Sequence, residues 1–125
     1  MTDFVALFIF SSLNLIVVLF QMGLAIGMPW GALSMGGKFP GRQPLSMRIV
    51  AIVNILLLCF LNLIVGVHSG EIYPEFQGFA SKAIWFVVVF FILGTILNTI
   101  TPSKKERIWA PVCAVQLASS LYLAL

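Results

Sequence analysis

Residues 27–44, GMPWGALSMGGKFPGRQP, separate the first two long apolar segments of the chain. This stretch holds five glycines and three prolines, too many helix breakers for a regular helix. Residues 28–37 are nevertheless uncharged and largely apolar. Irregular backbone cannot face lipid, because its polar groups would lack hydrogen-bond partners, so protein must cover it or it must line a wet cavity. Two interpretations are open: an interfacial loop anchored by Trp30, or a re-entrant loop that forms a pocket.

The segments around this stretch are typical of an integral membrane protein. The chain of 125 residues is 61% hydrophobic and 9% charged, with a mean hydropathy of +1.10, which lies outside the range of soluble domains. Four runs reach or approach the roughly 20 apolar residues that cross a bilayer core. We predict an all-α membrane four-helix bundle, one domain over residues 1–125, with helices at about 4–26, 46–69, 80–101 and 104–124.

Charge predicts how the bundle is oriented. The first and third connections carry six basic residues against the single acid Glu106, whereas the second carries Glu71 and Glu75. The six basic residues are Lys38, Arg42, Arg48, Lys104, Lys105 and Arg107. By the positive-inside rule the first and third connections are cytoplasmic, and both termini face outward. Topology alone accounts for the net charge of +3, so we expect no nucleic-acid partner.

Each predicted helix carries an amide side chain toward the cytoplasmic half of the membrane. These amides are Gln21, Asn54, Asn98 and Gln116. Amides in lipid hydrogen-bond across helices for about 0.6 to 2 kcal/mol each, so one interpretation is polar contacts that only hold the bundle together. The other is a polar cavity, open to the cytoplasm, beneath Trp30 and Trp109.

Gly23 and Gly27 in the first helix form a G-x-x-x-G pair, which allows the backbone of another helix to approach closely. Packing inside the bundle and homo-oligomer formation through this face are both open. In the third connection, Ser103 and Glu106 have the spacing of a capping box, which predicts that the last helix starts at about Lys104. Pro111 then falls inside that helix, where we expect a kink.

Several function classes lack their residues. No Asp, Glu, Lys or Arg lies near the middle of a predicted span, which disfavours a proton-coupled antiporter. No catalytic constellation, phosphate-binding loop or cluster with metal-ligand spacing is visible. We therefore expect a protein that is not an enzyme and that holds no cofactor or metal. Cys59 and Cys113 fall inside predicted spans, where a thiol behaves as a small hydrophobe, so no disulfide is expected.

A set of residues spread over most of the chain forms a recognisable pattern: Pro29-Trp30-Gly31, Gly36-Gly37, Pro44, Arg48, Leu93-Gly94-Thr95, Asn98, Ser103, Glu106-Arg107, Trp109 and Pro111. In this pattern the chain resembles small four-span bacterial membrane proteins of unknown function. The resemblance covers most of the chain. It implies a multi-pass protein of the bacterial inner membrane, and it supplies no activity, substrate or cofactor.

We predict a binding or accessory role: a cytoplasmic-side pocket for a lipid headgroup or a small amphipathic ligand, or a docking site for a protein partner. Its basic rim would attract anionic headgroups. The alternative is a small homo-oligomeric transporter or channel for a neutral or anionic solute. The candidate binding residues are Gln21, Trp30, Arg42, Arg48, Asn54, Asn98, Arg107, Trp109 and Gln116. We also expect the first connection to fold over the cytoplasmic end and to contact Asn98 and the start of the last helix.

Overall fold

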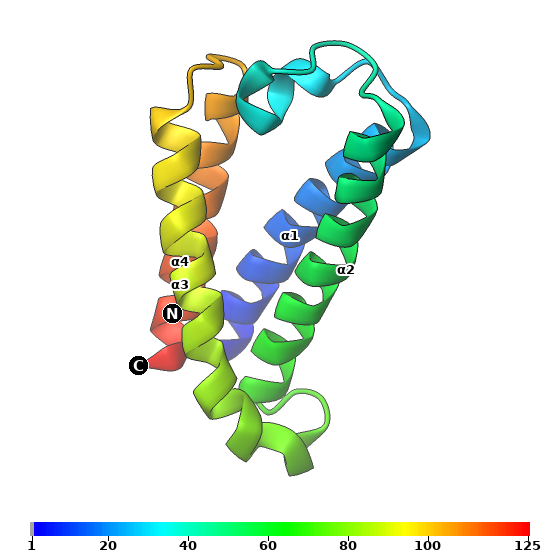
Figure 1. Cartoon of the computed structure of the whole chain (residues 1–125). Coiled ribbons are helices and arrows are strands. Elements are labelled where there is room, and N and C mark those ends of the chain that lie inside the picture. Colours follow the sequence, from blue (N-terminus) through cyan, green and yellow to red (C-terminus); the bar gives the residue numbers. More distant parts are fainter. Residues whose placement is uncertain (1) are drawn as a thin grey trace.

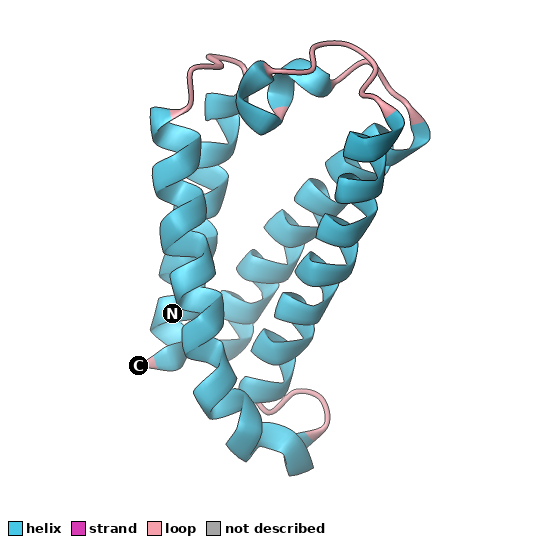
Figure 2. Cartoon of the chain, in the orientation of Figure 1, coloured by secondary structure: helices cyan, strands magenta, loops and turns pink. Residues whose placement is uncertain are grey.

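A computed structural model describes residues 2–125, which form four α-helices and no strand (Figures 1 and 2). The helices are α1 (Asp3–Ile26), α2 (Leu45–His68), α3 (Gln77–Ile100) and α4 (Trp109–Ala124). Single 3-10 turns lie between them: η1 (Gly31–Leu33), η2 (Met35–Gly37), η3 (Pro74–Phe76) and η4 (Glu106–Ile108). The all-helical class and the four predicted helices are confirmed. The starts of α3 and α4 differ from the predicted residues 80 and 104.

Three segments are long and apolar enough to cross a membrane: α1, α2 and residues 74–100, which join η3 to α3. At 1.5 Å per residue, the 16 residues of α4 extend about 24 Å, so α4 is shorter than the others. Large apolar side chains on every helix face outward, and Leu15, Leu56 and Leu97 are more than half exposed. Exposed apolar surface of this extent is typical of a surface that contacts a membrane or another protein. The fold is therefore that of a membrane protein.

The helices are arranged as two pairs that diverge. Helix α1 packs against α2 and α4, and α3 packs against α4 and α2. In Figure 1 the α1/α2 pair and the α3/α4 pair are closest at the lower end and farthest apart where residues 27–44 bridge them. A buried cluster fills the interior where the pairs meet, and in it the rings of Phe10 and Phe91 pack edge to face at 5.3 Å. The divergence leaves space at the other end.

We call residues 27–44 the first loop and residues 101–105 the third loop. Gly27 ends α1 with φ of +97°, and Met28 N–H donates to the Gly23 carbonyl at 2.9 Å, which is a Schellman motif. The first loop then doubles back on itself, because Gly31 N–H donates to the Gly41 carbonyl at 2.8 Å. After Pro44 the chain enters α2. The first loop is therefore folded, as the sequence predicted.

The G-x-x-x-G face of α1 is occupied by the first loop. A Cβ at Gly23 would lie 1.9 Å from the Trp30 ring, and a Cβ at Gly27 would lie 2.8 Å from the Arg42 side chain. The close approach that these glycines allow is thus made by two side chains of the same chain rather than by a helix. A second copy could pack its backbone on this face only after displacing Trp30 and Arg42.

The third loop forms only half of the predicted capping box. Glu106 N–H donates to Ser103 Oγ at 3.2 Å. The return bond is absent from this pair, because Ser103 N–H donates to Thr101 Oγ1 at 3.3 Å and the Glu106 carboxylate turns to other partners. Pro102 keeps Thr101 extended, with φ of −54° and ψ of 141°, as expected for a residue before proline.

The predicted start of the last helix is corrected, and with it the position of Pro111 within that helix. The α-helical hydrogen bonding begins at Trp109, after the 3-10 turn Glu106–Ile108. Pro111 is therefore the third residue of α4. In the first turn of a helix the backbone N–H has no partner within the helix, so the missing N–H of proline breaks no hydrogen bond there.

Replacing Gly31 with alanine should destabilise the fold. The new Cβ would lie 1.8 Å from the Phe39 carbonyl oxygen, and backbone atoms cannot move aside as the end of a side chain can. We expect the free energy of unfolding to fall by about 1–3 kcal/mol, which is measured as a lower thermal unfolding midpoint in detergent micelles. Gly78→Ala is the matched control, because no atom lies within 4 Å of its Cβ position in α3. An unchanged midpoint for Gly31→Ala would contradict this path of the first loop.

Candidate functional site

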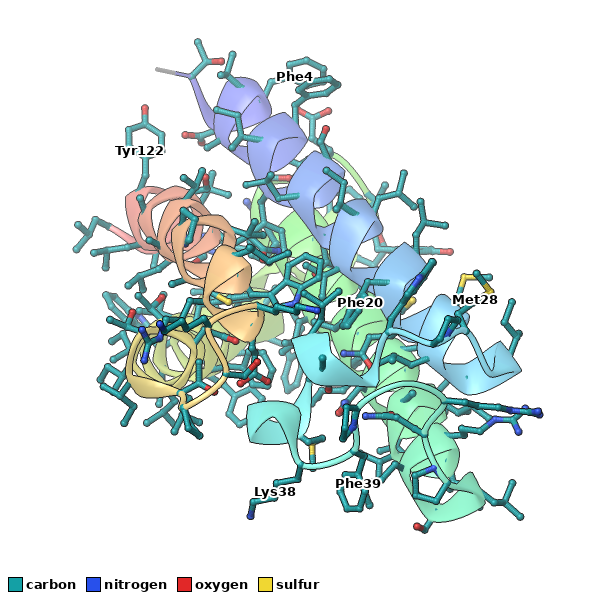
Figure 3. All side chains as sticks on the ribbon, turned by 90° about the horizontal axis from the view of Figure 1, so that it is seen from above. Phe4, Phe20, Met28, Lys38, Phe39 and Tyr122 are labelled. Carbon is teal, nitrogen blue, oxygen red and sulfur yellow. The ribbon has the colours of Figure 1, made fainter. Side chains whose placement is uncertain are left out.

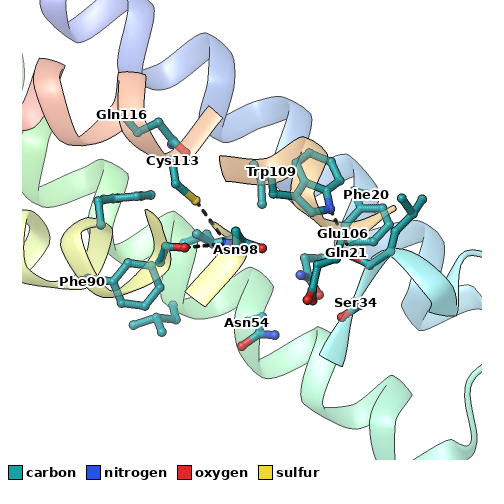
Figure 4. Close-up of a pocket in the computed structure, with 16 residues that line it drawn as sticks. Phe20, Gln21, Ser34, Asn54, Phe90, Asn98, Glu106, Trp109, Cys113 and Gln116 are labelled. Atoms are coloured by element: carbon teal, nitrogen blue, oxygen red, sulfur yellow. Dashed lines mark hydrogen bonds between the residues drawn. The ribbon is translucent and has the colours of Figure 1, made fainter. Parts of the chain in front are cut away.

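A cavity of about 190 Å³ lies between the two helix pairs, under the first loop (Figure 4). All four helices line it, together with the first loop and η4. Its lining residues are Val17, Phe20, Gln21, Leu33, Ser34, Asn54, Leu57, Leu58, Phe90, Phe91, Gly94, Asn98, Glu106, Trp109, Cys113 and Gln116. The set combines amides, a carboxylate, a thiol and a hydroxyl with aromatic and aliphatic groups. A cavity of this kind suits a small amphipathic molecule.

Contacts with residues at and after the end of α3 hold the first loop over this cavity as a roof. Ser103 Oγ–H donates to the Ala32 carbonyl at 2.6 Å, and the indole N–H of Trp109 donates to the Leu33 carbonyl at 3.1 Å. These bonds satisfy carbonyl groups in the irregular backbone, which is the condition for such backbone to lie at membrane depth. The first loop therefore contacts the start of the last helix, as predicted.

The carboxylate of Glu106 supplies the third contact. Gly36 N–H donates to its Oε1 at 3.2 Å and its Oε2 at 3.3 Å, and the Thr101 hydroxyl donates to Oε1. Glu106 also lines the cavity, and it is the one Asp, Glu, Lys or Arg among the described lining residues. The carboxylate thus belongs both to the roof and to the wall of the cavity.

A hydrogen-bonded amide pair lies deeper in the bundle. Asn14 Nδ2–H donates to the Leu58 carbonyl at 3.1 Å, and Gln116 Nε2–H donates to Asn14 Oδ1 at 3.3 Å. Both amides are buried, with 3% and 0% of their surface exposed. The carbonyl oxygens of Gln116 and Gln21 are also buried, but no group in residues 2–125 donates a hydrogen bond to either one. Two unpaired acceptors therefore belong to residues that line the cavity.

Aromatic rings form the walls near the roof. The rings of Phe20 and Trp109 approach to 4.7 Å at 44°, and Trp30 stacks on the outer side of Phe20 at 6.2 Å. On the α3 side, Asn98 Nδ2–H donates to the Gly94 carbonyl at 2.8 Å and contacts Cys113 Sγ at 3.6 Å. Figure 4 shows Asn98, Cys113 and Trp109 around the same space.

The structure brings five of the predicted binding residues to the cavity and leaves four outside it. Those at the cavity are Gln21, Asn54, Asn98, Trp109 and Gln116. Trp30 covers Gly23 instead.

The three predicted arginines lie at the ends of helices. Arg48 Nε–H donates to the Ala25 carbonyl at 2.9 Å, and Arg107 donates to the Thr101 carbonyl through Nε and Nη2 at 3.1 and 2.9 Å. Arg42 is exposed, with its guanidinium beside Gly27 (Figure 3 shows this end from above). The arginines therefore fix carbonyls or cover a helix end, and they do not form a basic rim around the cavity.

Sequence reasoning missed Glu106, Ser34 and Cys113 as lining residues. Glu106 was assigned to the capping box, which its spacing from Ser103 fits. The available signal was that it is the only acid in two strongly basic connections. Ser34 and Cys113 gave no local signal, because their places in the cavity depend on the folding of the first loop and on the rotation of α4.

Within residues 2–125, no group of three or more His, Cys, Asp or Glu side chains could hold a metal ion. His68 lies near the other end of the bundle, with Nε2 at 2.7 Å from the Leu123 carbonyl oxygen, and both cysteines are free thiols. Comparisons of the chain with protein-family models, with curated proteins and with solved structures found no match. The resemblance to small four-span bacterial proteins stays a prediction, and the site alone must carry any functional argument.

Replacing Trp109 with phenylalanine should loosen the roof while keeping an aromatic ring beside Phe20. The change removes the hydrogen bond to the Leu33 carbonyl, which is worth about 0.5–1.5 kcal/mol. We expect hydrogen exchange of the amides in residues 31–37 to become about 2- to 13-fold faster, measured by mass spectrometry of peptides. Trp85→Phe on the outer surface of α3 is the control and should leave these rates unchanged. Equal rates in all three proteins would contradict the anchoring role of Trp109.

Proposed function

We propose that this chain is a multi-pass membrane protein that binds a small amphipathic molecule in the cavity beneath the first loop, in a binding role rather than a catalytic one. One observation carries the proposal: Gln116 is fully buried, it lines the cavity, and its carbonyl oxygen accepts no hydrogen bond. A buried acceptor left unpaired costs about 1–3 kcal/mol. A ligand that donates a hydrogen bond there recovers this cost.

The lining defines the chemistry of that ligand. The carboxylate of Glu106 and the unpaired oxygens of Gln21 and Gln116 are acceptors, so they favour a ligand whose polar end carries donors. The rings of Phe20, Phe90 and Trp109 favour an apolar remainder. Because the arginines lie outside the cavity, an anionic headgroup or solute finds no counter-charge there. This argues against the anionic ligands that the basic connections suggested.

The packing below the cavity favours binding over passage of a solute through the chain. Phe10, Leu61 and Phe91 are at most 2% exposed and belong to the cluster that fills the closed end of the bundle. The Asn14–Gln116 pair closes the space above that cluster. A solute that entered from the end with the first loop would therefore meet packed side chains. No observation favours the alternative of a transporter or channel.

We further propose that the first and third loops are cytoplasmic, that α4 is a fourth span with both termini outside, and that the membrane is the bacterial inner membrane. The support is positional. The first and third loops lie together at one end of the bundle and the second connection lies at the other (Figure 1). All six basic connection residues are thus at one end, and Glu71 and Glu75 are at the opposite end. This is the charge distribution of the positive-inside rule.

The orientation predicts which engineered thiols react in intact cells. In a background with Cys59→Ser and Cys113→Ser, Glu75→Cys should react with a membrane-impermeant maleimide, and Lys105→Cys should react only after permeabilisation. Both parent residues are exposed, so access to the reagent decides the labelling. The readout is the mass shift of the purified protein. Labelling of Lys105→Cys alone in intact cells would show the opposite orientation.

Binding in the cavity is tested by mass spectrometry of the protein released intact from native membranes. The wild-type chain should retain a small ligand or lipid, and Gln116→Met should bind it about tenfold more weakly, since about 1.4 kcal/mol of hydrogen bonding is lost. Gly94→Leu should also reduce retention, because its side chain would occupy space beside Cys113 at the cavity wall.

Gln77→Met is the matched control, because Gln77 is exposed and bonds to the His68 carbonyl at the opposite end of the bundle. It should retain the ligand as the wild type does. Thermal unfolding of each variant shows whether the fold survives the loss of the Asn14 contact. The binding role would be refuted if the wild-type protein carries no bound molecule. It would also be refuted if Gln116→Met and Gly94→Leu, both folded, retain the ligand as well as the wild type does.

A further inference from the structure

A second hollow adjoins the cavity and opens on the outer surface of α3. It has a volume of about 510 Å³, and we call it the α3 groove. The α3 groove and the cavity share Gly94, Asn98 and Glu106 as lining residues. The remaining lining residues of the groove are Met35, Gly36, Lys38, Leu97, Ile100, Thr101 and Pro102. Glu106 and Asn98 thus lie where the inner cavity meets a groove on the lipid-facing side of the bundle.

The α3 groove has an apolar part and a charged part. Met35, Leu97 and Ile100 are 42%, 61% and 67% exposed, which provides an apolar track along the surface of α3. Lys38 lines the same groove from the first loop and is exposed. A molecule that extends from the cavity into the α3 groove therefore meets a carboxylate first, then a lysine beside apolar side chains.

The carboxylate of Glu106 has free hydrogen-bonding capacity toward such a molecule. Its Oε1 accepts from both Gly36 N–H and the Thr101 hydroxyl, but its Oε2 accepts only the longer bond from Gly36 at 3.3 Å. An ionised carboxylate has about four lone-pair sites. The carboxylate therefore has free acceptor sites for a group that carries several N–H donors, at the point where the cavity meets the α3 groove.

Resting on the binding role proposed above, we propose that the ligand is a zwitterionic glycerophospholipid with a primary ammonium headgroup, which enters sideways from the membrane. The ammonium group donates to Glu106, which lines both the cavity and the α3 groove, and the phosphate lies near Lys38 in the groove. The acyl chains leave along Leu97 and Ile100. Charge-assisted hydrogen bonds of this type are about twice as strong as neutral ones.

The same geometry sets the order of preference among lipids. A choline headgroup carries the same charge but has no N–H, so it leaves the acceptors of the cavity unpaired. A phosphatidylglycerol headgroup has hydroxyl donors but places no positive charge beside Glu106. Of these three headgroups, only the primary ammonium lipid offers N–H donors with a positive charge to Glu106 and a phosphate to Lys38.

The test is native mass spectrometry of the delipidated full-length chain in detergent, titrated with phosphatidylethanolamine, phosphatidylcholine and phosphatidylglycerol of identical acyl chains. We expect phosphatidylethanolamine to bind about tenfold more tightly than the other two. Glu106→Gln should reduce this preference to about threefold or less, because the amide keeps the shape but loses the charge. Lys38→Ala should weaken the binding of all three lipids to a similar extent, because each of them carries the phosphate. Glu75→Gln, an exposed acid at the opposite end, should change nothing.

Each outcome is decisive. Equal binding of phosphatidylethanolamine and phosphatidylcholine by the wild type, or an unchanged preference in Glu106→Gln, would refute the headgroup assignment while leaving the binding role intact. Competition by soluble phosphoethanolamine at the lipid's own concentration would refute the path of the acyl chains. If Glu106→Gln does not fold, the headgroup assignment is still tested by the lipid preference of the wild type and by the effect of Lys38→Ala, whose parent residue is exposed. Retention of no molecule by the wild type, in native extracts as well as in this titration, would refute the binding role itself.

Discussion

The hydrogen bonds that Gly36 N–H and the Thr101 hydroxyl donate to the Glu106 carboxylate are the constraint on which the rest of the structure depends. The Gly36 bond joins the first loop to the connection between α3 and α4, across 70 residues of sequence, and the Thr101 bond holds the carboxylate within that connection. Irregular backbone at membrane depth is tolerated only where its polar groups have partners. The carboxylate, the Ser103 hydroxyl and the Trp109 indole supply those partners. The first loop can therefore bridge two helix pairs that diverge beneath it, and the cavity exists because the bridge holds.

The intramembrane amides divide between two roles that the sequence left as alternatives. Asn14 and the Nε2 group of Gln116 bond across helices and tie α1 to α2 and α4, which is the role of polar contacts that hold a bundle together. The carbonyl oxygen of Gln116 and that of Gln21 accept nothing. One glutamine thus holds the bundle through its nitrogen and presents an unpaired acceptor through its oxygen. Unpaired acceptors of this kind are costly unless something donates to them, and this cost is the physical basis for a ligand.

Sequence patterns predicted the helices well because each depends on neighbouring residues. Long apolar runs set the spans, and the helix ends predicted next to Gly27 and Pro44 agree with the structure within one residue. Counting residues along helices predicted that one amide from each helix lies at a common level, and the four amides do line one cavity. The arginines were not placed correctly, because whether Arg48 and Arg107 face a cavity or a helix end depends on contacts that no periodicity encodes. The occupation of the Gly23 face by Trp30 likewise follows from the path of the first loop, which only the folded chain defines.

The topology of the chain does not explain why an acidic residue occupies position 106. The positive-inside rule accounts for the six basic residues at its end of the bundle, and a capping role would be fulfilled by a bond to the Ser103 N–H. That N–H is instead taken by Thr101 Oγ1 at 3.3 Å, so the carboxylate is turned toward the first loop and the cavity. A neutral side chain with an oxygen acceptor could receive the Gly36 N–H at this position. The charge strengthens the bonds from Gly36 and Thr101, and it also suits a positive partner. With the lysine on the groove side, it favours a partner that carries both an ammonium and a phosphate.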